Sequence, residues 1–306
     1  MPTLSEQRPA LPVLHDSLSS ESESAQTEFL RATRATLALT ALAAVAGAFT
    51  IGGETGADWA GVIAAIAFAG ALGARGWIVY RAPERRWYDA RAGAESAKTL
   101  AWQYAVGGGR FPLSLADADR RLLERLRELL RDLEDDLAPV PSGSHGQLTD
   151  WMRQVRSSAR DERINLYCAQ RVQDQIDWYS AKAAENRREA AKWNAITLAV
   201  YAAGVVVAVL KAAGVLGFDA LGIAAAAAGA TTAWLQTKDF VGLSEAYSVT
   251  AQELKAVQDE SRLVENEQGW VRFVEDAEDA ISREHTLWRA KRQRGALRSA
   301  VLSRRT

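Results

Sequence analysis

Few residues in this chain have the type and spacing that catalysis or metal binding would need. Glu278 and His285 lie seven residues apart, two turns along one face of a predicted helix. A metal pair on a helix usually has i, i+4 spacing and a third ligand, so we interpret this pair as a structural hydrogen bond. Cys168 is the only cysteine, which leaves no thiol metal site and no disulfide. With no nucleophile–base pair in view, we expect no enzyme, no metal and no cofactor.

The glycine run Gly107 to Gly109 is the part of the sequence that invites comparison with a phosphate-binding loop. It does not fit the Walker or Rossmann patterns, in which glycines open a helix after a strand. It falls between two helical patterns, where glycine commonly caps the end of a helix. We therefore predict a cap, and expect a nucleotide signal to arrive through a separate protein or through a helical pocket that the sequence does not reveal.

Two polar stripes are candidates for contacts between helices or with a partner. Arg91, Glu95, Lys98 and Trp102 recur every three or four residues and so share a helical face. They could form a surface ion pair, worth about 0.3–0.5 kcal/mol, or a contact between subunits or units. The second stripe and the C-terminal candidates comprise Arg171, Gln175, Trp178, Tyr179, Lys182, Asn186, Glu278, His285 and Trp288. Such residues more often pack polar edges between helices, but they could also contact a partner or line a vestibule.

These stripes adjoin four apolar stretches that are arranged as two pairs. The stretches are Ala35 to Gly53, Trp59 to Tyr80 (interrupted only by Arg75), Trp193 to Leu210, and Ala220 to Leu235. A helix that crosses a bilayer needs about 17–25 apolar residues. The sequence therefore predicts an all-α membrane protein with four transmembrane helices in two hairpins, from about Ala35 to Tyr80 and from about Trp193 to Leu235.

Charged residues around the stretches predict their orientation. Arg31 and Arg34 precede the first stretch, and Lys238 follows the fourth, whereas Asp58 and Asp219 lie in the short connections. Because positive charge stays on the cytoplasmic side, we expect both connections outside and both chain termini in the cytoplasm. A soluble protein with very apolar core helices is the alternative, which the recurring pairs and ordered charges disfavour.

Small and weakly polar residues dominate the apolar stretches. In lipid, small residues let helices approach closely, either within one chain or between subunits. The candidates for packing, or for lining a pore, are Thr36, Thr40, Gly70, Thr197, Gly204, Gly229, Thr231 and Thr232. No buried charge is expected that would mark a selective ion path, so a pore would be poorly selective.

The rest of the pattern suggests two helical units in tandem. We predict a disordered leader (1–20), a first two-transmembrane unit (21–137), a linker (138–146), a second such unit (147–294) and a basic tail (295–306). Apolar positions spaced by three and four before the third stretch and after the fourth predict long cytoplasmic helices that pair as a coiled-coil-like stalk, the second of them broken near Gly269. The net charge of −1 gives no pull toward nucleic acid.

Scattered residues in both halves resemble the SLATT family, two-transmembrane effector domains associated with bacterial nucleotide-signalling conflict systems. In the first half they are Trp87-Tyr88, Arg91, Ala94-Glu95-Ser96, Lys98-Thr99, Trp102-Gln103-Tyr104 and Phe111-Pro112. In the second half they are Arg163, Tyr167, Arg171, Gln175, Trp178-Tyr179, Lys182-Ala183, Asn186, Glu278, Ile281-Ser282, Glu284-His285 and Trp288. The two sets are similar to two different subtypes and together span roughly residues 20–290.

The resemblance implies a multi-pass effector of the bacterial inner membrane. We expect it to form a pore or perturb the bilayer on homo-oligomerisation, triggered by a separate sensor or nucleotide-messenger system. The alternative is a membrane-anchored helical scaffold that recruits a soluble partner. Replacing the hairpins with an unrelated anchor should abolish the first function and preserve the second.

Overall fold

The computed structural model describes residues 4, 7–51, 56–133, 141 and 145–282. Within these residues the secondary structure is helical and contains no strand, which confirms the all-α prediction. The helices are α1 (Val13–Gly47), α2 (Trp59–Arg81), α3 (Pro83–Val106), α4 (Ala118–Asp132), α5 (Asp150–Ser157), α6 (Arg160–Tyr167), the π-helix η1 (Cys168–Gln173), α7 (Asp174–Ala212), α8 (Ala220–Lys238), α9 (Phe240–Glu260) and the 3₁₀ turn η2 (Ser261–Leu263). A further helical segment covers residues 267–282.

The chain forms two compact units, and each draws on both halves of the sequence. The first, here called the polar unit, comprises Met1–Ser22, Tyr88–Ala183 and Glu245–Thr306. The second, here called the apolar unit, comprises Glu23–Trp87 and Ala184–Ser244.

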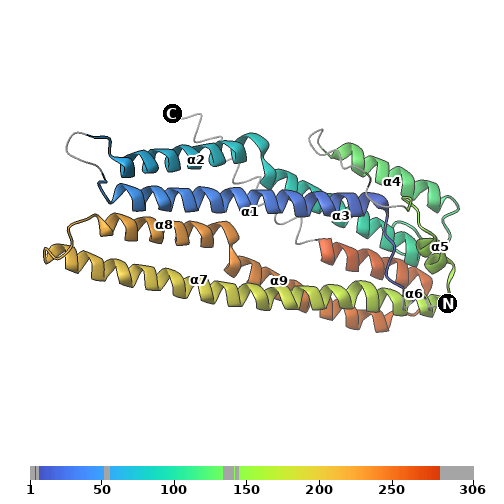
Figure 1. Ribbon diagram of the computed structural model, residues 1–306. Coiled ribbons are helices and arrows are strands. Elements are labelled where there is room, and N and C mark those ends of the chain that lie inside the picture. The colour runs from blue at the N-terminus through green and yellow to red at the C-terminus, as the bar shows by residue number, and fades with distance from the viewer. Residues whose placement is uncertain (1–3, 5–6, 52–55, 134–140, 142–144, 283–306) are drawn as a thin grey trace, which may run out of the picture. The chain divides into compact units, whose positions relative to one another are not determined.

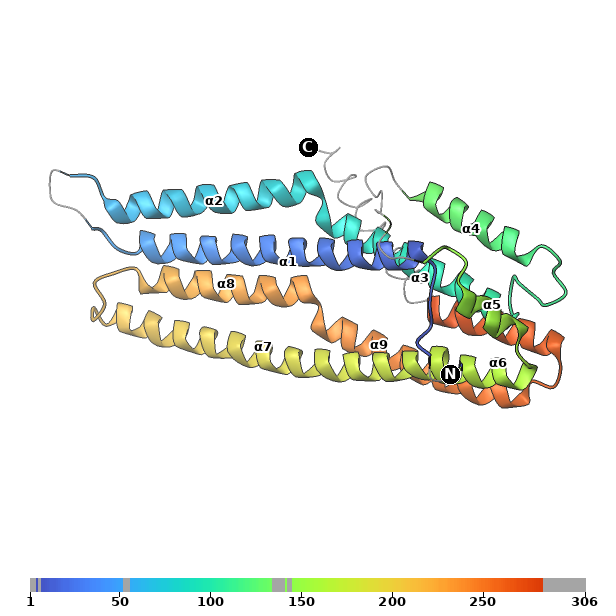
Figure 2. The ribbon, with the colours of Figure 1, turned by 45° about the vertical axis from the view of Figure 1, so that its right-hand side comes forward.

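The apolar unit contains most of α1, α2, α7 and α8. Figures 1 and 2 show α2 beside α1, and α8 between α1 and α7. Glycines allow some of these close approaches. A Cβ atom at Gly70 would lie 3.2 Å from the Leu39 side chain, and one at Gly204 would lie 3.7 Å from Ala224. The unit is therefore closely packed through small residues.

Three helical segments are long and apolar enough to cross a membrane: Val13–Gly47, Trp59–Val106 and Arg160–Ala212. Each extends well beyond its apolar stretch, which begins only at Ala35 in the first and at Trp193 in the third. The 19-residue α8 is not among the three. It is rich in alanine, and Gln236 and Lys238 lie at its end.

Both halves interrupt the chain in the same way after the second apolar helix. Ala82 ends α2 and Asp239 ends α8, each in the left-handed conformation, with φ of 42° and 44°. Their backbone N–H groups donate to the carbonyls of Ile78 and Leu235, which satisfies orphan acceptors at the helix ends. Neither residue is glycine, although this conformation costs other residues about 1–2 kcal/mol. The same kind of break therefore follows the second apolar helix in each half of the sequence.

The polar unit has an aromatic core. Trp102 of α3 lies edge-on to Trp151 and Tyr167, with ring centroids 5.3 and 5.8 Å apart. Tyr167 in turn lies edge-on to Trp270 at 5.7 Å. Trp102, Tyr167 and Trp270 have no more than 1% of their surface exposed. Large aromatic groups bury much surface each and so contribute strongly to this unit's stability.

The structure corrects two predictions about element ends. The leader predicted to be disordered over 1–20 becomes helical at Val13, because Leu14 and Leu18 are buried and Thr149 Oγ1 donates to the Ala10 carbonyl at 2.7 Å. The break predicted near Gly269 lies earlier, over 261–266. Gly269 instead belongs to the first turn of the next helix, and its N–H donates to Asn266 Oδ1.

Candidate functional site

A short π-helix sets the centre of the polar unit. The π-helix Cys168–Gln173 connects α6 to α7 without a break in the helical rod. Each of its turns contains an extra residue, and such segments occur often at functional sites. Arg163, Tyr167 and Arg171 follow one another at intervals of four across α6 and η1, and all three are at most 1% exposed. Two charged side chains are thus fully buried.

Arg171 forms a bidentate ion pair with Glu278. Its Nε donates to Oε1 at 3.0 Å and its Nη2 donates to Oε2 at 2.7 Å. Both side chains have 0% exposed surface. Removing both charges from water is costly, and only good geometry with further hydrogen bonds offsets that cost. The pair is therefore sensitive to any change that removes one partner.

Two hydroxyl groups complete the coordination of the Glu278 carboxylate. Tyr167 donates its hydroxyl to Oε1 at 3.0 Å, and Thr99 of α3 donates to Oε2 at 2.8 Å. Burial, and then the Glu278 charge, raise the pKa of Tyr167 well above its usual value, so the phenol stays protonated as a donor. We name Thr99, Tyr167, Arg171 and Glu278 the buried tetrad. Thr99 joins the first half of the sequence to three residues of the second half.

One hydrogen-bond donor of the buried tetrad has no partner. Arg171 Nη1 is buried and makes no hydrogen bond to any described residue. Lys98, one turn before Trp102 on α3, lies nearby and is partly buried. Burial, followed by the Arg171 charge, lowers the pKa of Lys98. Glu95 is a second carboxylate whose charge acts on both Arg171 and Lys98.

A second buried arginine fixes the end of α3. Arg163 donates through Nη1 to the Val106 carbonyl at 2.6 Å and through Nη2 to Glu267 Oε1 at 2.5 Å. Trp270 Nε1 donates to the same carbonyl at 2.8 Å. The bonds from Arg163 Nη1 and Trp270 Nε1 satisfy the Val106 carbonyl, which the helix leaves without an intrahelical partner. Like the buried tetrad, this contact joins the two halves of the chain.

The glycine run forms the cap predicted from the sequence. Gly107 has φ of +68°, and the N–H of Gly108 donates to the Gln103 carbonyl at 2.9 Å, as in a Schellman motif. A Cβ atom at Gly108 would lie only 2.4 Å from Val274 Cβ. Glycine is therefore favoured at Gly107 by the left-handed conformation of the turn. At Gly108 it is required by the close contact with the 267–282 helix.

Arg156 of α5 holds the chain after this cap. Its guanidinium donates to the carbonyls of Tyr104, Phe111 and Pro112 at 2.8–2.9 Å. It also lies 4.9 Å from the centre of the Tyr104 ring. Burial is the main cause of its lowered pKa. This arginine is structural.

The residues predicted from the first polar stripe separate in the structure. Arg91 lies over the Trp178 ring at 5.6 Å, which is a cation–π contact between the two halves of the sequence. Glu95 is partly buried. Trp102 belongs to the aromatic core rather than to a surface face. The three- and four-residue spacing did not distinguish the residue in the core from those nearer the surface.

The second stripe contributes to packing of α7 on α9. The ring centroids of Trp178 and Tyr179 lie 5.5 and 5.6 Å from the centroid of the Tyr247 ring. Gln258 Nε2 donates to Gln173 Oε1 at 2.8 Å. The remaining predicted residues Gln175, Lys182 and Asn186 are partly buried. His285 and Trp288 lie outside the described residues, as does the proposed hydrogen bond of His285, and so do the basic tail and most of the predicted linker.

The predicted pore and packing residues lie in the apolar unit. Thr36, Thr40 and Thr231 each donate to a carbonyl of their own helix, at 2.8–3.1 Å, so these hydroxyls satisfy the backbone. Thr197 Oγ1 is buried and has no partner among the described residues. A Cβ at Gly229 would meet nothing within 4 Å, and Thr232 is partly buried.

Sequence reasoning missed Tyr167 and Thr99 as ligands of Glu278, and missed Arg156, Arg163 and Glu267 altogether as site residues. The spacing of Arg163, Tyr167 and Arg171 at four-residue intervals was a usable signal. It marks one face, yet a charged face is usually exposed. Only the tertiary structure shows that this one is buried.

Comparison with known proteins agrees with this architecture. Residues 12–164 match SMODS and SLOG-associating 2TM effector domain 3, and residues 167–288 match SMODS and SLOG-associating 2TM effector domain 1. The chain therefore belongs to the SLATT family of two-transmembrane effector domains and contains two of them in tandem. No curated protein and no solved structure matched the chain. Thr99 lies in the first domain, and the rest of the buried tetrad lies in the second.

Proposed function

We propose that this protein is an effector of the bacterial inner membrane whose copies assemble to open a poorly selective path through the bilayer. In this proposal α1, α2, α7 and α8 cross the membrane as two hairpins. A separate sensor supplies the trigger. The proposal assigns the protein no catalytic step and no cofactor.

One observation carries the proposal: burial in the apolar unit is inverted with respect to a water-soluble core. In α2, Ala60, Ala67 and Ala71 are 1–6% exposed, whereas Ile66 and Leu72 are 67% and 74% exposed. In water, large apolar side chains are driven inside. Lipid removes that drive, so close packing of small residues takes over.

The same inversion occurs in α7. Leu198, Val205 and Val209 are 63–71% exposed along the helix. A soluble protein rarely exposes apolar area of this extent. The pattern supports contact with lipid and disfavours the alternative of a soluble protein with very apolar core helices.

The ends of the apolar helices support the proposed orientation. The ring centroids of Trp193 and Trp234 lie 5.9 Å apart. Arg34 Cζ and Lys238 Nζ lie 5.0 and 6.0 Å from the centroid of the Trp234 ring. Tryptophan with lysine and arginine is typical of a cytoplasmic membrane interface. We place this end at the cytoplasm and the connections that carry Asp58 and Asp219 outside. The short α8 is taken as a fourth span because its tryptophan lies at this level.

The proposal requires assembly of several chains. Three of the threonines bond to their own helices, and the inward positions are mostly alanine, so the described residues of one chain form no polar path through the apolar unit. An assembly could place weakly polar faces around a common axis. Signals would travel along α7, which contributes residues to both units, with α9 beside it in a coiled-coil-like stalk.

Permeability and mass measurements test the proposal. The full chain in mild detergent should have a native mass of several copies, and on reconstitution with its activated sensor it should release ions from liposomes. A persistent monomer that leaves liposomes sealed would contradict the pore. Retained function after both hairpins are replaced by an unrelated two-span anchor would instead establish the membrane-anchored scaffold.

A further inference from the structure

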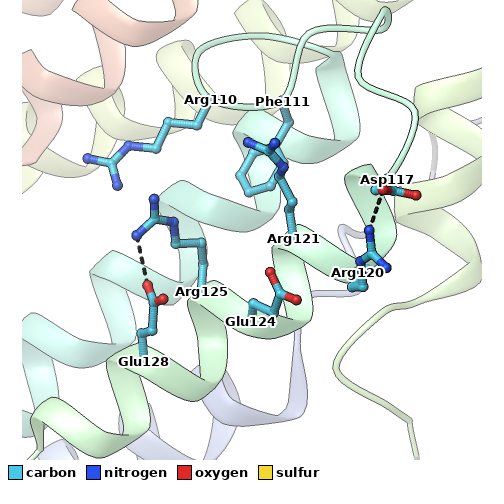
Figure 3. Close-up of a pocket in the computed structure, with 8 residues that line it drawn as sticks. All are labelled: Arg110, Phe111, Asp117, Arg120, Arg121, Glu124, Arg125 and Glu128. Atoms are coloured by element: carbon cyan, nitrogen blue, oxygen red, sulfur yellow. Dashed lines mark hydrogen bonds and ion pairs between the residues drawn. The ribbon is translucent and has the colours of Figure 1, made fainter.

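A hollow of about 620 Å³ lies on the polar unit where the chain between α3 and α4 meets α4 (Figure 3). Its size falls within the range of small-molecule sites. Arg110, just after the glycine cap, lies across from α4, which contributes Arg120, Arg121 and Arg125. Phe111 lines the hollow too. The fold thus gathers four arginines from two segments.

The carboxylates that line the hollow neutralise only part of this charge. Arg120 pairs with Asp117, and Arg125 Nη1 lies 2.7 Å from Glu128 Oε2. Glu124 is the third carboxylate of the lining. The guanidinium groups of Arg110 and Arg121 make no hydrogen bond or ion pair with any residue in the described part of the chain.

A solvated helix face explains only some of these residues. It accounts for the i, i+3 pairs of Arg120 and Arg125, which are common on exposed helices. It does not account for Arg121, whose guanidinium has no carboxylate partner among the described residues and lies at i, i+4 from a second arginine, Arg125. Nor does it explain why Arg110, from another segment, borders the same hollow. A bound anion would supply the missing partner.

We propose that this hollow binds a phosphate-bearing ligand, with Arg110 and Arg121 as its direct ligands. The guanidinium group presents a planar fork of donors that matches phosphate oxygens. Arg120 and Arg125 lie at the rim, paired with Asp117 and Glu128, and so contribute little net charge. The ligand is either a free phosphorylated small molecule or the headgroup of an anionic lipid. Neither case depends on pore formation.

The test is a titration of the full-length protein in nanodiscs of zwitterionic lipid. Inorganic pyrophosphate and then ATP are added, and binding is followed by calorimetry. A second arm titrates short-chain phosphatidylglycerol, with short-chain phosphatidylcholine as the reference, into the protein in the same nanodiscs. The variant is Arg110→Gln with Arg121→Gln, and both positions are exposed. Arg127→Gln, also exposed and on α4, removes charge outside the lining and serves as the matched control.

Loss of both direct ligands should weaken binding at least tenfold, because it removes the charge-assisted hydrogen bonds to the phosphate oxygens. Arg127→Gln should leave binding within about twofold, as expected for a surface charge outside the site. Arginine-dependent binding in the first arm identifies a free phosphate ligand, and in the second arm alone it identifies a lipid headgroup. No binding in either arm, or an equal loss in Arg127→Gln, would overturn the proposal. Either result leaves the liposome test of the pore unaffected.

Discussion

Arg171 and Glu278 form a bidentate ion pair without any exposure to solvent, although 106 residues separate them in the sequence. Arg171 is positioned by a π-helix and Glu278 by the 267–282 helix. Thr99 and Tyr167 complete the hydrogen bonding of the carboxylate. The pair thus ties three helical segments, from both domains, into one polar unit.

Removing one partner of this pair should destabilise the polar unit strongly. We expect Glu278→Ala to lower the free energy of unfolding by about 3–5 kcal/mol, because it leaves the Arg171 charge buried and uncompensated. Chemical denaturation in detergent micelles, followed by tryptophan fluorescence, would measure the change. Glu275→Ala, at an exposed position on the same helix, should change the free energy by no more than about 0.5 kcal/mol.

Replacing both partners separates the cost of a lone charge from the worth of the pair. The double variant Arg171→Met with Glu278→Leu should be less destabilised than either single variant, since apolar pairs of similar volume often replace buried ion pairs at little cost. Additive losses in the double variant would show that the two side chains act independently, against the geometry described above.

The glycine cap predicts a second sensitive position. Gly108→Ala would place a methyl group 2.4 Å from Val274 Cβ, so the turn and the 267–282 helix must move apart. We expect a loss of about 1–3 kcal/mol, typical of overpacking, read from the same denaturation curves. At Gly76 of α2 a Cβ would meet nothing within 4 Å. Gly76→Ala should be neutral or stabilising, and an equal loss there would refute the steric explanation.

Matched leucines distinguish lipid from water as the solvent of the apolar unit. Leu72 of α2 and Leu263 of the polar unit are 74% and 78% exposed. In water both should tolerate arginine. In our account Leu72→Arg faces lipid and costs about 2.5–3.5 kcal/mol near the centre of a span, whereas Leu263→Arg is harmless. The yield of each variant in the membrane fraction measures this, and equal yields would argue against lipid contact.

The sequence was most informative where one physical rule acts alone. Length and the absence of charge marked the apolar stretches from Ala35 and Trp193, because a bilayer sets both. The cap at Gly107 followed from the need for a left-handed residue at a helix end. These features are local, so no knowledge of distant contacts is required.

Long-range burial was not predictable from the same patterns. Arg163 and Arg171 look like surface residues, since arginine is almost never fully buried unless it is paired. Their partners Glu267 and Glu278 are more than 100 residues away. The helical start at Val13 was missed for the same reason: Leu14 and Leu18 pack within the polar unit, whereas the prolines and serines around them suggested disorder.

Labelling of the two short connections tests the proposed membrane topology most directly. Cys168→Ala removes the only native cysteine, and Ala57→Cys, Gly217→Cys or Leu263→Cys then adds one at an exposed position. In intact spheroplasts, a membrane-impermeant maleimide should label Ala57→Cys and Gly217→Cys but should reach Leu263→Cys only after lysis. If the two connections stay unlabelled until lysis, or if all three sites react alike, α1, α2, α7 and α8 do not cross the membrane as two hairpins.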